Sequence, residues 1–279
     1  MLTTSYHTHN RYCDGEGAIA EYLEAAIGAG LEAIGVSSHS PLTFPNDYAM
    51  RAGELPAYCA EVERLRNSYA GRLRVHLGME FDFIPEYAAP LWEIVAPFRF
   101  EFLIGGVHFV GHDAAGVPWA FDLTRQGFEQ GLDEIFGGDV RALVAAYYER
   151  VRSLAAWNLV AIVAHLDHIK TWNGDGRYFS EDEGWYRDEV EAALRACAQA
   201  GLIVEVNTSG WRGSATAPHP SPWIVRRCVE MEIPLVVTAD AHQPEHVAAF
   251  YAEAEAMLRE AGCSATAVLR EEGWRMERF

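Results

Sequence analysis

The chain has 279 residues, half of them hydrophobic, and a formal net charge of −18 at neutral pH. Its length suits one large α/β barrel domain or two ordinary domains. Nucleic-acid backbones are bound by basic stripes, which this acidic sequence lacks, so we expect no nucleic-acid partner. A small phosphorylated substrate is compatible with the charge, because bound divalent cations reverse the sign of the local field.

Seven short apolar segments, each bounded by turn residues, have the pattern of buried β-strands. They cover residues 4–7, 33–38, 74–80, 102–108, 160–165, 202–207 and 234–239. Helical spacing of apolar residues occurs between most of these strands and after the last one. The segments with this spacing are 19–27, 140–151, 190–198, 223–231 and 246–258. Gly201 is expected to end the third of these helices.

The alternation of strand and helix predicts parallel pairing with right-handed crossovers. Because no domain-sized linker separates the units, the pattern favours a closed (β/α)7 barrel, and we expect residues 1–279 to form a single domain. No glycine-rich phosphate-binding motif follows the first strand, which argues against a dinucleotide-binding fold. The long break at 110–138 is expected to be a lid or an insertion at the barrel rim.

Candidate metal ligands follow six of the seven predicted strands. In (β/α) barrels, reactive groups lie at the carboxyl ends of the strands and on the loops that follow. His7 and His9 are two residues apart, so in an extended segment they point the same way. The other residues of this kind at strand ends are His39, Glu80, His108, His165, Asp240 and His242. One histidine at a strand end is usually capped or solvated, but six such ends together predict a metal site.

Imidazole and carboxylate ligands without thiolates suit zinc, manganese or iron. The candidates are too many for one ion, so we expect two or three divalent cations. A barrel that holds a structural or storage metal is the non-enzymatic alternative. Structural sites are closed four-coordinate cages, whereas a carboxylate shared between ions favours an enzyme with open positions. An amidohydrolase-type barrel lacks support, since no lysine follows a strand where it could bridge two metals.

In its candidate ligands the sequence resembles the PHP (polymerase and histidinol phosphatase) family of metal-dependent phosphoesterases. The resemblance covers nearly the whole chain and rests on the order and spacing of the candidate ligands, beginning with His7-Thr8-His9 and Asp14. It implies a distorted seven-stranded TIM-like barrel with a trinuclear site. The segments 38–41, 105–109, 165–170 and 205–212, followed by 220–222, look most like the monofunctional histidinol-phosphatases of histidine biosynthesis. A PHP enzyme with another substrate, such as a nucleoside-monophosphate phosphatase or a nuclease, is the alternative.

The resemblance also implies how the ligands divide among three metal positions. The first position would take His7, His9, Glu80 and Asp240. The second would share Glu80 as a bridge and add His108 and His165. The third would take Asp14, His39 and His242, with Glu16 as an alternative to Asp14.

Such a site predicts hydrolysis of a phosphate ester, in this branch L-histidinol phosphate. Two metal ions about 3.5–4 Å apart can lower the pKa of a bound water to near 7. Glu80, as the bridge, and Asp240 or His242, as proton relay, are therefore the predicted catalytic residues.

Arg212 is the candidate phosphate clamp, because a guanidinium binds phosphate bidentately; a solvated loop arginine is the alternative. Lys170 and Ser221 are further candidates for substrate contact, and such a contact is the alternative to a structural role for His219. Asp167 is a candidate for orienting a ligand histidine. We expect structural roles, without metal, for the remaining histidines, which are His76, His112, His168, His219 and His246.

The compartment is predicted from the cysteines and the termini. Five cysteines without a Cys-x-x-Cys pair indicate reduced thiols in a cytoplasmic protein. The start of the chain lacks the basic and apolar regions of a signal peptide. No apolar run approaches the roughly 20 residues that span a bilayer, so we expect no membrane partner. The oligomeric state is not predicted.

Overall fold

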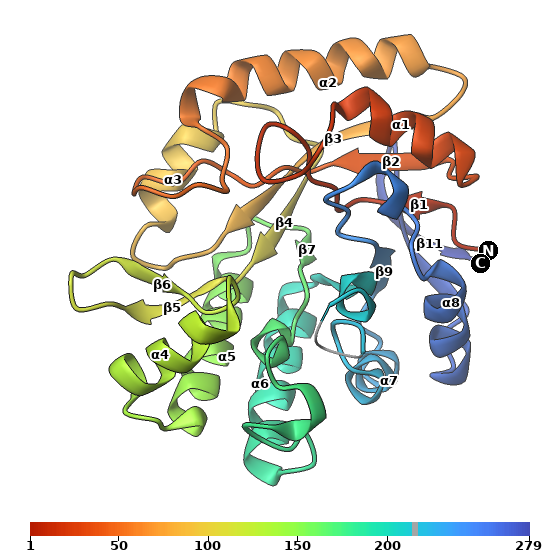
Figure 1. The fold of residues 1–279 in the computed structure, drawn as a ribbon. Coiled ribbons are helices and arrows are strands. Elements are labelled where there is room, and N and C mark those ends of the chain that lie inside the picture. The colour runs from red at the N-terminus through yellow and green to blue at the C-terminus, as the bar shows by residue number, and fades with distance from the viewer. Residues whose placement is uncertain (214–216) are drawn as a thin grey trace.

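A barrel of seven parallel strands organises the computed structural model, which describes residues 1–213 and 217–279. The strands neighbour one another in the order β1-β2-β3-β4-β7-β8-β9 (Figure 1). Their bounds are β1 (Thr4–Ser5), β2 (Ala33–Val36), β3 (Arg74–Asp82), β4 (Phe102–Gly106), β7 (Ile162–Val163), β8 (Ile203–Asn207) and β9 (Leu235–Thr238). Each lies inside or across a predicted strand segment, so the predicted order is confirmed.

The barrel closes just beyond the carboxyl ends of its first and last strands. The backbone N–H of His9 donates to the carbonyl of Ala241 at 2.8 Å, and the N–H of Ala241 donates to the carbonyl of His7 at 3.2 Å. This closure brings the loop after β1 against the loop after β9. It therefore places two histidines and two further candidate ligands, remote in sequence, at one point of the rim.

Helices cover the outside of the barrel (Figure 1). They are α1 (Ile19–Gly28), α2 (Leu55–Tyr69), α3 (Ala88–Val95), α4 (Arg125–Phe136), α5 (Val140–Trp157), α6 (Gly184–Ala200), α7 (Pro222–Glu230) and α8 (Tyr251–Glu260). Gly201 follows α6 with a φ of 69°, a left-handed conformation that ends a helix as predicted. The last predicted helix starts late, because Pro244–His246 forms a separate 3-10 turn before α8.

None of the helices in the described part of the chain combines the length and the apolar composition that a membrane crossing requires.

The break predicted at 110–138 forms a structured insertion at the barrel rim. Strands β5 (Phe109–His112) and β6 (Pro118–Ala120) pair as an antiparallel hairpin. Helix α4 follows, and the hydroxyl of Thr124 caps it by accepting from the N–H of Gly127. The turn between β6 and α4 faces the interior of the site, where it supplies part of the pocket wall.

A carboxyl-terminal hairpin that the sequence analysis did not predict plugs the opposite end of the barrel. Strands β10 (Ala265–Arg270) and β11 (Gly273–Arg278) pair antiparallel. Leu269 packs with the inward side chains of the barrel strands, and its N–H donates to the Tyr6 hydroxyl at 2.9 Å. Trp274 stacks edge-on against the same tyrosine, with ring centroids 5.0 Å apart. The hairpin therefore covers the amino end of the barrel, opposite the end at which the candidate ligands lie.

Candidate metal centre

The carboxyl ends of the barrel strands bring all nine predicted metal ligands into one cluster. Their ligand atoms form four overlapping groups, within each of which the atoms lie within 4.8 Å of one another. The groups are His9, Asp14, His39 and His242; His7, His9 and Asp240; His39, Glu80 and His108; and His108, His165 and His168. His168 joins the last group, although the sequence analysis expected it to lie apart from any metal.

Glu80, within β3, lies at the centre of the cluster with its two oxygens facing different histidines. Oε2 lies 3.1 Å from His7 Nε2 and 3.4 Å from His9 Nε2. Oε1 lies 3.1 Å from His165 Nε2 and 3.6 Å from His108 Nε2. The carboxylate therefore has the position that a bridge between two cations requires.

Asp240 completes the first set of ligands from the loop after β9. Its Oδ1 lies 3.2 Å from His9 Nε2 and 3.6 Å from His7 Nε2. The Asn207 amide donates to the other oxygen, Oδ2, at 3.0 Å. Asp240 has a φ of 48°, and His165 has a φ of 27°, both in the left-handed region that non-glycine residues rarely adopt. Such backbone strain at two candidate ligands is typical of a functional site.

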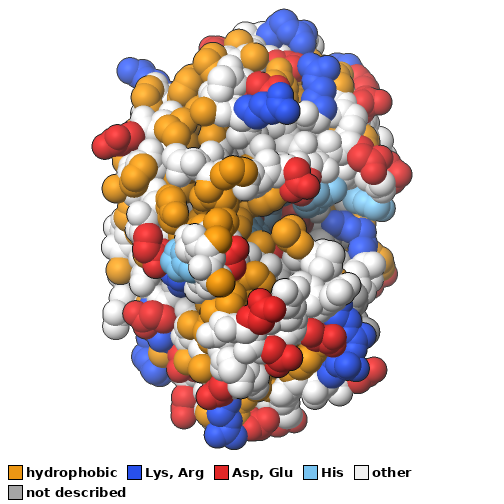
Figure 2. Space-filling view, turned by 60° about the vertical axis from the view of Figure 1, so that its left-hand side comes forward, with side chains coloured by type: hydrophobic (Ala, Val, Ile, Leu, Met, Phe, Trp, Pro, Cys, Tyr) orange, Lys and Arg blue, Asp and Glu red, His pale blue; other side chains and the backbone are white. Residues whose placement is uncertain are grey.

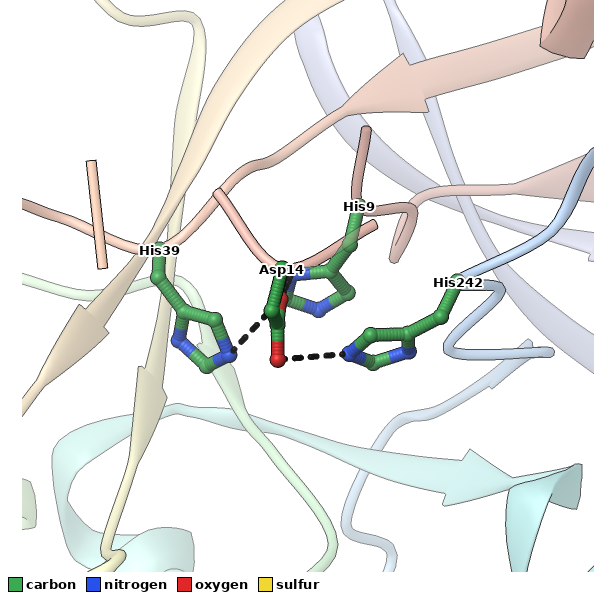
Figure 3. Close-up of side chains that lie close together, drawn as sticks. All are labelled: His9, Asp14, His39 and His242. Carbon is green, nitrogen blue, oxygen red and sulfur yellow. Dashed lines mark ion pairs between the residues drawn. The ribbon is translucent and has the colours of Figure 1, made fainter. Parts of the chain in front are cut away.

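Asp14 lies between two histidines that come from opposite sides of the site (Figure 3). One carboxylate oxygen is 3.4 Å from His242 Nε2, and the other is 3.9 Å from His39 Nε2. Glu16, the alternative to Asp14, instead accepts a hydrogen bond from the Gln243 amide at 2.9 Å. The geometry therefore favours Asp14 for the third set.

Two buried carboxylates that were not among the predicted site residues orient the ligand histidines from behind. His7 donates through Nδ1 to Glu205 at 2.6 Å, and His108 donates through Nδ1 to Asp82 at 2.5 Å. When each ring is neutral, these bonds fix the tautomer in which Nε2 faces the cluster with a free lone pair. The signal was present in the period of the strands, because Asp82 lies two residues after Glu80 and shares its face. Glu205 gives β8, the one predicted strand without a candidate ligand at its end, a part in the site.

Within the cluster, the pKa of His7 is raised and the pKa of Glu80 is lowered. Burial alone would lower the pKa of His7, but the carboxylates of Asp240 and Glu80 outweigh it and raise that pKa well above its ordinary value. Burial alone would raise the pKa of Glu80, but His7, His39 and His108 hold it well below the usual range. In the absence of cations, protons on the imidazoles therefore balance the carboxylate charge.

This charge balance predicts how pH affects the stability of metal-free protein. Burial opposes the shift, but Asp82 and Glu80 raise the pKa of His108 to about 9. A raised pKa stabilises the fold below the unfolded value of about 6.5, and this stabilisation is lost as pH rises through the folded value. We expect the Tm of chelator-treated protein to fall between pH 7 and pH 9, approximately the interval between these values.

Differential scanning fluorimetry measures this Tm with and without added Zn²⁺ or Mn²⁺. With metal the fall should disappear, because cations replace the protons and bind better to deprotonated ligands. A metal-free Tm that rises across the same interval would contradict the expected protonation of the cluster.

The residues of the cluster fit a group of divalent cations. Five buried atoms of predicted ligands have no hydrogen-bond partner among the described residues, namely His7 Nε2, His9 Nε2, His39 Nδ1, His165 Nδ1 and Asp240 Oδ1. A Cβ at Gly106 would lie 2.6 Å from Glu80 Oε1, so the space beside that oxygen is kept open by glycine. Unpartnered nitrogen and oxygen ligands around an open space match the coordination preferences of zinc, manganese and iron.

The predicted substrate residues Lys170 and Ser221 contact each other in the loops after β7 and β8. The Lys170 ammonium is buried, pairs with Asp167 at 2.7 Å and donates to Ser221 Oγ and to the carbonyl of Pro218. Neither residue lines the pocket over the metal ligands. Asp167 also accepts from His219, so it orients that histidine and not a ligand of the cluster. These contacts link the loops after β7 and β8, and contact of Lys170 and Ser221 with substrate stays a prediction.

Arg212, the predicted phosphate clamp, hydrogen-bonds to the backbone of Asp240. Its Nη2 donates to the carbonyl of Asp240 at 2.8 Å, and its Nη1 is buried without a hydrogen-bond partner among the described residues. Burial lowers the pKa of this guanidinium from its ordinary value. The arginine supports the strained backbone of a candidate ligand, and contact with phosphate stays a prediction.

The pocket over the cluster opens as a hollow in which histidine side chains are visible, bordered by hydrophobic side chains (Figure 2). Seven of the nine predicted ligands line it in part, and its opposite wall consists of residues that the sequence analysis did not select. These are Tyr48, Ala120, Asp122, Leu123 and His168. Four of them lie in long loops or in the rim insertion, where no strand period connects them to the ligand pattern.

Comparison with known proteins identifies the family of the chain. Residues 5–209 match the PHP domain. The chain belongs to the PHP family. The "Probable histidinol-phosphatase" of Deinococcus radiodurans is 31% identical over 92% of this chain and 92% of its own length. The "Histidinol-phosphatase" of Bacillus subtilis is 26% identical over 88% of this chain and 95% of its own length.

A solved structure shares the fold of this PHP protein. It is histidinol phosphate phosphatase from Lactococcus lactis, complexed with Zn, L-histidinol and phosphate. The two superpose with a TM-score of 0.75 at 18% identity, over 99% of this chain and 100% of the other. The family and the (β/α)7 barrel inferred from the sequence are thereby confirmed.

Proposed function

We propose that this chain hydrolyses L-histidinol phosphate to L-histidinol and inorganic phosphate with two or three divalent cations. The observation that carries the proposal is the position of Glu80, whose two oxygens face separate sets of imidazoles. A shared carboxylate fits an open polynuclear site better than a closed structural cage. The relatives that match over nearly their whole length carry the name of this activity.

In this proposal the metal ligands are the nine that the sequence predicted, divided among three positions. The first position takes His7, His9, Asp240 and one oxygen of Glu80. The second takes the other oxygen of Glu80 with His108 and His165. The third takes Asp14, His39 and His242. Zinc, manganese or iron held there would lower the pKa of a coordinated water and neutralise the phosphoryl oxygens.

The protein's own contribution is to hold these groups before substrate arrives. Glu205 and Asp82 fix the rings of His7 and His108 from behind, so the nitrogens that face the cluster do not have to reorganise. Asp240 is the better candidate for moving a proton to the leaving alkoxide. His242 already donates through Nδ1 to the carbonyl of Asp240, which leaves its Nε2 for the third metal position.

Phosphate release from purified protein tests the proposal. Protein reconstituted with Zn²⁺, Mn²⁺ or Fe²⁺ is assayed with L-histidinol phosphate, AMP and a phosphodiester. We expect the highest kcat/KM with L-histidinol phosphate and loss of turnover after chelation, because the ligand set binds cations reversibly. Preferred hydrolysis of AMP or of the diester would instead assign the protein to the nucleotide-directed members of the family.

A further inference from the structure

Glu205, in β8, is a fully buried carboxylate that four hydrogen-bond donors surround. Its Oε1 accepts from His7 Nδ1 and from the Thr238 hydroxyl, each at 2.6 Å. Its Oε2 accepts from the backbone N–H of His165 at 2.7 Å and from the Asn207 amide at 3.0 Å. These donors come from the loops after β1 and β7 and from strands β8 and β9, so one side chain joins four neighbouring segments of the barrel.

The two donors on Oε2 cannot reverse their direction. A backbone N–H can only donate, so the contact with His165 has a fixed sense. The Asn207 side chain is oriented from its far end, because its Oδ1 accepts from the N–H of Ser209 at 2.9 Å. Its nitrogen therefore faces Glu205, and it also donates to Asp240 Oδ2 at 3.0 Å. Any atom at the position of Oε2 has to accept two hydrogen bonds.

The two donors on Oε1 can instead become acceptors. The Thr238 hydroxyl can rotate, and its oxygen has lone pairs. A neutral imidazole carries one proton, on Nδ1 or on Nε2, and the partner of one nitrogen decides the state of the other. His7 Nε2 lies 3.1 Å from Glu80 Oε2 and 3.6 Å from Asp240 Oδ1, where a cation would need its lone pair. The group at the position of Oε1 therefore decides whether His7 is able to bind a metal.

We propose that Glu205 is a positioning residue that selects the metal-binding tautomer of His7, and that Glu205→Gln would select the opposite tautomer. The amide oxygen of the variant has to lie at the Oε2 position, because the donors of His165 and Asn207 are fixed there. The amide nitrogen then lies at the Oε1 position and donates to His7 Nδ1. The proton of the imidazole moves to Nε2, where it excludes a cation. This inference rests on the metal centre of the proposed function and extends it to the device that makes one ligand competent.

The geometry confines the expected effect to one metal position. The contacts of Oε2 survive in Glu205→Gln, so the backbone of His165, with its left-handed φ of 27°, keeps its support. His108 is still oriented by Asp82. The second position therefore keeps both imidazoles, and only His7, at the first position, meets a donor in place of an acceptor. A general weakening of the barrel would instead affect all the ligands together.

Glu205→Gln tests the proposal through metal binding as well as through turnover. We expect the Zn²⁺ affinity of the first position to fall by about 100-fold, the upper end of the effects of residues that orient metal ligands. Competition with a chromogenic chelator should then show about one tightly bound Zn²⁺ per chain fewer than in wild-type protein. Long-range proton–nitrogen NMR spectra of zinc-treated protein report the tautomer. His7 should carry its proton on Nδ1 in the wild type and on Nε2 in the variant.

Tyr251→Phe is the matched control for loss of a hydrogen bond between the same strands. The Tyr251 hydroxyl donates to the carbonyl of Thr4 in β1 at 3.0 Å and lies 3.4 Å from the carbonyl of Val237 in β9. Its removal leaves all four donors of Glu205 in place, so it should lower the Tm and leave Zn²⁺ binding unchanged.

Glu205→Met provides a second comparison, because methionine has no N–H to donate and leaves the tautomer of His7 free. It also leaves the donors on Oε2 without a good acceptor. We expect a lower Tm than for Glu205→Gln but a higher Zn²⁺ affinity at the first position. If the methionine variant does not fold, Glu205→Gln and Tyr251→Phe still decide the question.

Loss of Zn²⁺ from all positions in Glu205→Gln, in step with the Tm, would overturn the proposal, since Glu205 would then act on the fold. Unchanged Zn²⁺ affinity, or a His7 that keeps its proton on Nδ1 in the variant, would overturn it too. Wild-type protein that binds no Zn²⁺ would overturn the inference together with the metal centre. If wild-type protein binds Zn²⁺ but does not hydrolyse L-histidinol phosphate, only the substrate assignment is wrong, and the Zn²⁺ affinities still decide the role of Glu205.

Discussion

Replacing Glu80 with alanine is expected to abolish phosphate release, with a loss in kcat/KM of about 1,000-fold or more, because the variant removes ligands from two metal positions at once. Glu80 Oε2 lies against His7 and Oε1 lies against His165, so no neighbouring side chain can take both places. The measurement is kcat/KM together with metal content per chain after gel filtration, which should fall below that of wild-type protein.

Two further variants distinguish loss of metal from loss of fold. Glu80→Gln keeps the shape of the side chain but supplies one oxygen and no charge, so it should retain less metal than wild type and more than Glu80→Ala. His76→Ala removes a buried imidazole at the plugged end of the barrel, where it pairs with Glu101 at 2.7 Å. This control should keep its metal and its kcat. A Glu80→Ala protein with full metal content and near-normal turnover would show that the carboxylate is not a bridge.

The barrel could be predicted because its strands are buried on both faces. Continuous apolar runs such as 33–36 and 235–238 stand out from the amphipathic helices between them, and strand order follows chain order in such folds. The ligands could be predicted for a related reason. A residue at the carboxyl end of a parallel strand has its position set by the fold, so His39 and His242 meet although about 200 residues separate them.

The residues that the sequence did not reveal depend on contacts with no regular period. Lys170 follows a strand and is cationic, which predicted a contact with substrate, but its buried pair with Asp167 could not be predicted from the sequence. Asp122 lies in a rim insertion whose path is set by Phe121 and Trp172, and a linear pattern does not indicate which way it faces. The sequence of the β10–β11 hairpin does not distinguish it from a surface hairpin, because only the packing shows that its apolar face lies inside the barrel.

Replacing Gly106 with alanine is expected to lower kcat/KM by about 100-fold, because a displacement of roughly 1 Å at a reacting centre has effects of that size. Gly106 ends β4, and its added Cβ would lie 2.6 Å from Glu80 Oε1 and 2.7 Å from His108 Cε1. Both contacts are too short, so the carboxylate or the imidazole has to move out of its present position. Metal at the position shared by Glu80, His108 and His165 should be lost first, which metal analysis of the purified variant measures.

The neighbouring glycine separates an effect on the site from an effect on the strand. Successive residues of a strand point to opposite faces, and a Cβ at Gly105 would meet Leu154 of α5 at 2.7 Å, outside the barrel. Gly105→Ala should therefore cost about 1–3 kcal/mol of stability through overpacking but retain metal and kcat. Equal losses of metal in the two variants would mean that β4 tolerates no side chain on either face. Loss confined to Gly106→Ala would mean that the missing Cβ is a requirement of the metal centre itself.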